Sequence, residues 1–68
     1  MPLKIKKLRA ALARAGFIKR PGKGSHTVWI HPAIPEAPVT VSGQDGEDTK
    51  SYQLKDVQDV LRKVGKRL

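Results

Sequence analysis

The chain has 68 residues, a length that predicts a single domain over residues 1–68 with a small core. It contains no cysteine, so disulfides and thiolate zinc sites are excluded. The net charge of +8 is unevenly distributed, because all the acidic residues lie in residues 35–68. Residues 1–34 therefore carry only positive charge, which attracts polyanions and favours nucleic acid as a partner over an anionic lipid surface.

No stretch of the sequence approaches the roughly 20 apolar residues that a membrane span requires. In residues 1–7, lysines separate the apolar side chains, so this segment lacks the hydrophobic core of a signal peptide. We therefore expect a cytoplasmic protein with no membrane association.

The first element is predicted to be a helix that ends at Gly16, a residue suited to the left-handed stop. Lysines and arginines, among them Lys6 and Lys7, occupy its polar circumference. The apolar residues recur at helical spacing and form one stripe: Ile5, Leu8, Leu12 and Ala15.

Three short strands follow, over residues 17–20, 27–31 and 39–42, because these segments are rich in β-branched and aromatic side chains. Residues 21–24 form a turn by composition, and residues 43–48 form an acidic turn.

The last element is a second amphipathic helix, with Ser51 as its expected cap. Its apolar stripe consists of Leu54, Val57, Leu61, Val64 and Leu68. The element order is therefore α-β-β-β-α, which predicts an α+β fold with two helices on one face of a three-stranded antiparallel sheet. This is the double-stranded-RNA-binding-domain-like arrangement, and it leaves the other sheet face open to solvent.

Conventional phosphate-loop, dinucleotide and zinc-protease motifs are absent from the sequence. The two histidines, His26 and His31, would lie roughly 16 Å apart on a straight strand and on opposite faces. They are therefore unsuited to share a metal ion, and we expect no metal and no cofactor.

His26 is the candidate catalytic residue, because it directly follows the basic turn. A neutral imidazole can remove a proton from a ribose 2′-hydroxyl near pH 7, and such help typically accelerates a reaction by ~10²–10⁴. Nearby cations would stabilise the charge that develops on the phosphate. The candidate RNA-binding residues are Lys6, Lys7, Lys19, Arg20, Lys23, Gly24 and Ser25.

From the residues alone, a purely structural role remains possible for His26, His31 and Trp29. His31 is expected to be a surface residue that ends its strand, and Trp29 is more suited to packing than to stacking on a base. Simple alternation places His26 on the same face as Val28 and Ile30. If those two residues face the helices, His26 points inward unless a bulge resets the alternation.

The segment Lys23-Gly24-Ser25-His26-Thr27-Val28-Trp29, followed by His31-Pro32, strongly resembles the HicA toxins. The resemblance includes the ending of the first helix in Ala15-Gly16-Phe17, the strand Val39-Thr40-Val41 and the closing helix, and thus nearly the whole chain. It differs at Thr27, where many members have a second histidine, and in the acidic turn, where many have a histidine.

The resemblance implies a double-stranded-RNA-binding-like fold and metal-independent cleavage of messenger RNA, with His26 as the catalytic histidine. It also implies a HicB-like antitoxin that binds the toxin and covers this histidine in a hetero-oligomer. Two alternatives remain, a non-catalytic RNA-binding module and a protein that is stable only in a complex.

Overall fold

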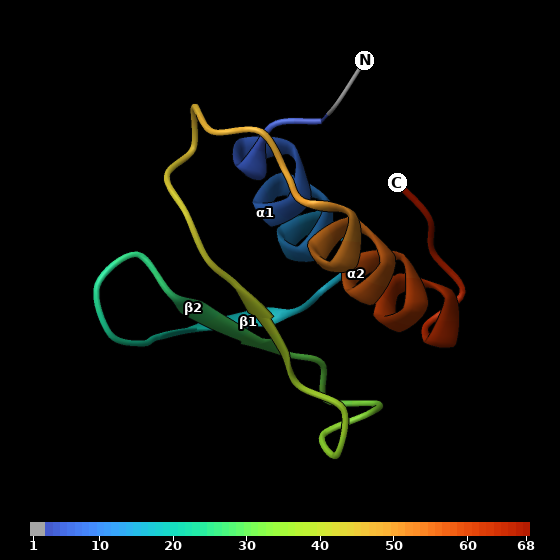
Figure 1. Cartoon of the computed structure of the whole chain (residues 1–68). Coiled ribbons are helices and arrows are strands. Elements are labelled where there is room, and N and C mark those ends of the chain that lie inside the picture. The colour runs from blue at the N-terminus through green and yellow to red at the C-terminus, as the bar shows by residue number, and fades with distance from the viewer. Residues whose placement is uncertain (1–2) are drawn as a thin grey trace.

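A computed structural model describes residues 3–68; residues 1 and 2, which the expected domain includes, lie outside the described part. Helix α1 spans Ile5–Arg14 and helix α2 spans Ser51–Lys63. Between them lie strands β1 (Ile18–Pro21), β2 (Thr27–Ile30) and β3 (Val39–Val41). Both strand pairs are antiparallel and the sheet order is β1-β2-β3, which confirms the predicted α+β arrangement. Figure 1 shows the two helices side by side on one side of the sheet.

The core lies between the helices and the sheet and is built from the predicted stripes. The apolar residues of α1 and α2 pack against Trp29 and the two valines of β3. Six side chains are fully buried: Ile5, Leu8, Leu12, Val41, Val57 and Leu61. The helix spacing in the sequence therefore identified the side chains that hold the fold together.

Both helices end in the same hydrogen-bonded motif. The Gly16 and Phe17 N–H groups donate to Ala13 and Leu12 carbonyls at 3.2 and 3.0 Å, and Gly16 has a φ of +95°, as expected for the left-handed stop. The Gly65 N–H donates to Arg62, and the Lys66 N–H donates to Leu61.

The predicted boundaries need small corrections. Helix α2 ends at Lys63, so Val64 and Leu68 of the predicted stripe lie outside it, and Leu68 is exposed. Ser51 is the first residue of α2 and not its cap; the Gln53 side chain instead accepts a hydrogen bond from the Lys50 N–H at 3.2 Å and donates to Ser42. Each strand differs by one residue from its predicted range, at one end or at both.

The alternation of β2 places Trp29 on the helix side, where it is only 5% exposed. Val28 and Ile30 consequently lie on the outer face, so the condition under which His26 would point inward is not met. Burying the large indole on the core side removes more apolar surface from water than burying either aliphatic neighbour. No bulge is required to turn His26 outward.

Within residues 3–68, none of the helices combines the length and the apolar character that crossing a membrane requires.

Candidate active site

A tight turn between β1 and β2 presents His26. The His26 N–H donates to the Lys23 carbonyl at 3.0 Å, and the Gly22 N–H donates to the His26 carbonyl at 3.0 Å. Gly24 has a φ of +58° and Ser25 has no positive φ, which is the pattern of a type II′ hairpin turn. A Cβ atom at Gly22 would lie 2.9 Å from the His26 carbonyl oxygen, so this close approach requires glycine. The backbone of His26 is thus fixed by its own turn.

The side chain of His26 lies on the outer face of the sheet and is exposed. The strand register places Arg20, Val28 and Thr40 side by side on this face. Two residues further along the register, on the same face, His26 lies between Gly22 and Ser42. Among residues 3–68, no hydrogen bond engages the imidazole, so both ring nitrogens are available.

A groove of about 590 Å³ extends from His26 across β3 to helix α2. Its strand side includes Thr40 and Ser42. Its helix side carries Tyr52, Asp56, Asp59 and Lys63, which recur at helical spacing on one face of α2. These four residues were not predicted as site residues from the sequence. The only signal for them in the sequence was their helical spacing. Its meaning could be recognised only once α2 was known to lie beside β3.

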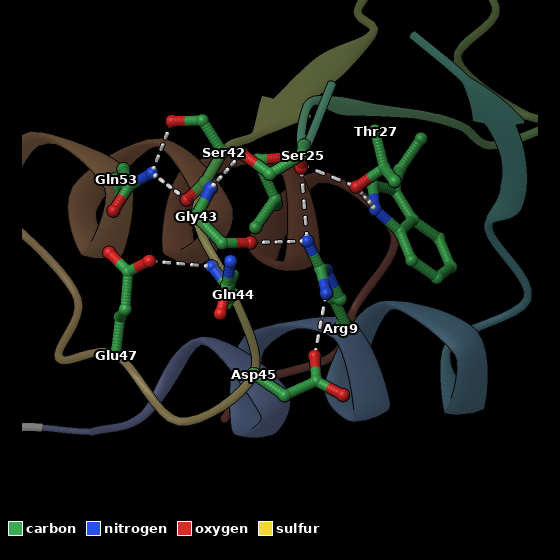
Figure 2. A network of polar contacts seen from close by, with 11 residues as sticks. Arg9, Ser25, Thr27, Ser42, Gly43, Gln44, Asp45, Glu47 and Gln53 are labelled. Atoms are coloured by element: carbon green, nitrogen blue, oxygen red, sulfur yellow. Dashed lines mark hydrogen bonds and ion pairs between the residues drawn. The ribbon is translucent and has the colours of Figure 1, made fainter. Parts of the chain in front are cut away.

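Arg9 of α1 connects the turn before His26 to the segment that follows β3 (Figure 2). Its Nη2 atom donates to the Ser25 carbonyl at 3.1 Å and to the Gly43 carbonyl at 2.6 Å. Its Nη1 atom pairs with Asp45 at 2.6 Å, and the side chain is only 23% exposed. Arg9 therefore serves the structure of the site, and its charge is partly neutralised.

The side chains on either side of His26 have structural hydrogen bonds of their own. The Ser25 hydroxyl accepts a hydrogen bond from the Gly43 N–H at 3.2 Å. The Thr27 hydroxyl accepts from the Trp29 indole N–H at 3.0 Å and donates to the Val41 carbonyl at 3.2 Å. Thr27 thus points to the helix side, away from the groove face of His26.

The acidic turn after β3 supplies hydrogen-bond acceptors to the first N–H groups of α1. The Ile5 N–H donates to the Glu47 carbonyl at 2.9 Å, and the Lys6 N–H donates to the Asp45 carbonyl at 3.2 Å. These bonds satisfy helix N–H groups that otherwise lack partners, and the carboxylates lie near the positive end of the helix. Asp48 pairs with Lys4. The acidic sequence of this turn thus has a structural explanation.

The predicted RNA-binding residues fall into two groups. Lys23, Gly24 and Ser25 form the turn beside His26, and Arg20 shares its face of the sheet. Lys19 pairs with Trp29 and therefore lies on the opposite side of β1, although it is exposed.

The other group, Lys6 and Lys7, lies on α1. These lysines line a separate hollow with Asp45 and Gly46, and neither contributes to the His26 groove.

His31 corrects the expectation of a surface residue. It is half-buried, and its Nδ1 atom accepts a hydrogen bond from the Ala33 N–H at 3.0 Å. The ring proton then lies on Nε2, which donates to the Ala15 carbonyl at 3.1 Å. The ring also meets Phe17 edge to face, with centroids 5.1 Å apart. Both ring nitrogens of His31 are therefore occupied.

The groove has the components of an acid–base site: an exposed imidazole, a tyrosine hydroxyl across β3 and the Lys63 ammonium of α2. Arg20 lies on the same face of the sheet as His26, outside the groove lining. In the part of the chain that the structure describes, no cluster of three or more histidine, cysteine or acidic side chains could hold a metal ion.

The family model described as the HicA toxin of bacterial toxin–antitoxin systems matches residues 5–66. The match begins with the first residue of α1 and ends three residues after α2, so it includes every helix and strand. A comparison with curated proteins finds no significant match.

Proposed function

This chain belongs to the HicA toxin family of bacterial toxin–antitoxin systems, and from this premise we propose that it is an endoribonuclease that cleaves messenger RNA with His26 as the catalytic residue. The observation that carries the proposal is the contrast between a fixed backbone and a free imidazole. Gly22, Lys23 and Arg9 hold the turn, while both ring nitrogens of His26 stay available on an exposed face.

The proposed reaction begins when His26 removes the proton from a ribose 2′-hydroxyl. The 2′-oxygen forms a bond to the adjacent phosphorus, and the bond from phosphorus to the 5′-oxygen breaks. The leaving oxygen takes a proton from the imidazolium or from water. The products are a 2′,3′-cyclic phosphate and a 5′-hydroxyl, and the reaction requires neither a metal nor a cofactor.

The cations near the turn stabilise the phosphate as its negative charge increases. Lys23 and Arg20 are suited to this role by their positions beside His26 and on its face. The Gly24 N–H group and the Ser25 hydroxyl lie in the same turn, while Lys19, Lys6 and Lys7 contribute to long-range attraction of RNA. The toxin acts in the cytoplasm, and a HicB-like antitoxin binds over His26 in a hetero-oligomer.

The test compares the wild type with His26→Ala, each expressed without an antitoxin, and follows growth and RNA integrity. We expect the wild type to stop growth and fragment messenger RNA, and the variant to do neither. Because His26 is exposed and its ring makes no hydrogen bond within residues 3–68, the variant should unfold at the same urea concentration as the wild type.

The chemical route has its own test in the ends of the fragments. Fragments that carry only 3′-hydroxyl ends would contradict transfer to the 2′-oxygen. Growth inhibition that survives His26→Ala, with RNA bound but intact, would instead identify a non-catalytic RNA-binding module. Absence of toxicity in both proteins would indicate a protein that functions only in a complex.

A further inference from the structure

A second basic surface lies on the helix side of the molecule, away from His26. Three adjoining hollows lie along the segment after α2, one against α2 and two against α1, and they share lining residues, among them Arg14, Lys66, Arg67 and Leu68. We name this region the tail surface. Its basic residues are Lys7, Arg14, Arg62, Lys66 and Arg67, and no aspartate or glutamate side chain lines any of the three hollows.

The ending of α2 creates the tail surface. Gly65, with a φ of +75°, reverses the chain, and the Lys66 N–H donates to the Leu61 carbonyl at 2.8 Å. The last residues then return toward α1, where Leu68 lines a hollow with Lys7 and Arg14, and Figure 1 shows this returning segment in red. Bases from the two ends of the sequence consequently meet at one place.

The acidic residues of the second half lie elsewhere. Glu36 lies in the loop between β2 and β3. The turn at the start of α1 contains Asp45, Glu47 and Asp48, and the His26 groove is lined by Asp56 and Asp59. Residues 35–68 are neutral as a sequence, but their acids and bases are separated in space. The tail surface is therefore more uniformly basic than the His26 groove, whose lining includes two carboxylates and one lysine.

Among residues 3–68, the ion pairs are Lys4–Asp48 and Arg9–Asp45, so no cation of the tail surface is paired with an acidic side chain. Uncompensated like charges repel one another, and a polyanion relieves this repulsion by replacing small counterions. The backbone of RNA carries one phosphate per nucleotide and can contact several of these cations at once.

We propose that the tail surface binds RNA backbone phosphates outside the cleavage site, and thereby increases the affinity of the protein for long RNA without reading bases. This inference rests on the proposed ribonuclease function and adds a second contact region to it. It predicts that a long RNA gains affinity from the tail surface, whereas a dinucleotide, which occupies only the His26 site, does not.

The binding experiment uses the His26→Ala protein, so that RNA stays intact, and a single-stranded RNA of about 20 nucleotides. The test variant carries Arg14→Gln and Arg67→Gln. The control carries Lys50→Gln and Lys55→Gln, which removes the same charge from exposed positions near the start of α2. We expect the test variant to bind about tenfold more weakly at 0.1 M salt, with a salt slope reduced by about 1.4, because each lost single-strand phosphate contact reduces it by about 0.7.

Equal losses in the test and control variants would show only a general effect of net charge and would overturn the proposal. An unchanged salt slope in the test variant would overturn it as well. If the test variant binds RNA normally but loses a co-expressed antitoxin, the tail surface is a protein interface and the proposal is wrong.

The kinetic experiment places the same substitutions in the protein with His26 intact. We expect an increased KM for long RNA and unchanged cleavage of a dinucleotide. If the wild type cleaves neither substrate, the proposed ribonuclease function fails, while the binding experiment still decides whether RNA contacts the tail surface. An unchanged KM for long RNA in an active protein would contradict the tail surface alone.

Discussion

Strand β2 has a histidine near each end, and the two ends are built in opposite ways. At the turn end, Gly22, Lys23 and Arg9 hold the backbone, and the His26 ring is left exposed. At the other end, the His31 ring itself holds the chain, because it joins the Ala15 carbonyl to the Ala33 N–H. A histidine that uses both ring nitrogens for structure has none left to exchange a proton with a substrate.

The comparison shows that residue type and position in the sequence do not decide which histidine can react. Both histidines flank the same short strand, and both belong to the segment that resembles the family. The availability of the ring nitrogens distinguishes them. For His31 it depends on a local contact with Ala33 and on a contact with Ala15, 16 positions away.

The largest expected effect belongs to His26→Gln in the purified protein. We expect the rate of RNA cleavage to decrease by ~10²–10⁴, the usual contribution of a general base. The midpoint of urea unfolding should stay unchanged, because the ring makes no hydrogen bond within residues 3–68. A parallel decrease in stability and rate would show that His26 is a structural residue like His31.

His31→Ala should have the opposite effect. The substitution removes two hydrogen bonds and the edge contact with Phe17, so we expect a loss of about 2–3 kcal/mol in the free energy of unfolding. Urea unfolding measures this loss. Below the unfolding transition, the cleavage rate per folded molecule should stay within about twofold of the wild type. A large decrease in that rate with normal stability would place His31 in the reaction.

The sequence was sufficient for the framework because local spacing determines it. The stripes of α1 and α2, the glycine that ends α1 and the strands between them follow from periodicity and turn chemistry, and the His26 turn follows from its glycines. The sequence also defined the ambiguity of β2 correctly: either Val28 and Ile30 or Trp29 faces the helices. Trp29 resolved it, because a strand alternates and only one of its two faces can bury the largest side chain.

The remaining parts of the site were not predictable, because they depend on contacts between distant segments. In the sequence, nothing distinguishes Arg9 from the other basic residues of α1. Only the fold places it beside the Ser25 and Gly43 carbonyls. Tyr52 and Asp56 became groove residues only because α2 lies beside β3. The tail surface also could not be recognised from the charge along the sequence, because its basic residues come from both ends of the chain.

Arg9→Gln tests whether the turn end is held from outside. The variant loses the charged hydrogen bonds to two carbonyls and the ion pair with Asp45, so we expect a loss of about 2 kcal/mol in unfolding free energy. The Ser25 carbonyl loses a donor, so the position of His26 becomes less defined and kcat should decrease while KM for a dinucleotide changes little. Arg9→Lys should recover only part of the loss, because an ammonium lacks the planar fork of donors. Normal kcat in Arg9→Gln would show that the turn is sufficient by itself.

The smallest effect is expected for Lys4→Gln, which serves as the matched comparison for Arg9→Gln. Lys4 also joins α1 to the acidic turn through an ion pair, but both side chains are 56% exposed and no buried carbonyl depends on them. Exposed pairs of this kind contribute roughly 0–1 kcal/mol, and salt screens them. We therefore expect a barely measurable change in urea unfolding and no change in kcat. If Lys4→Gln were as harmful as Arg9→Gln, the charge of the acidic turn, and not the hydrogen bonds to the Ser25 and Gly43 carbonyls, would be what holds the turn end of β2.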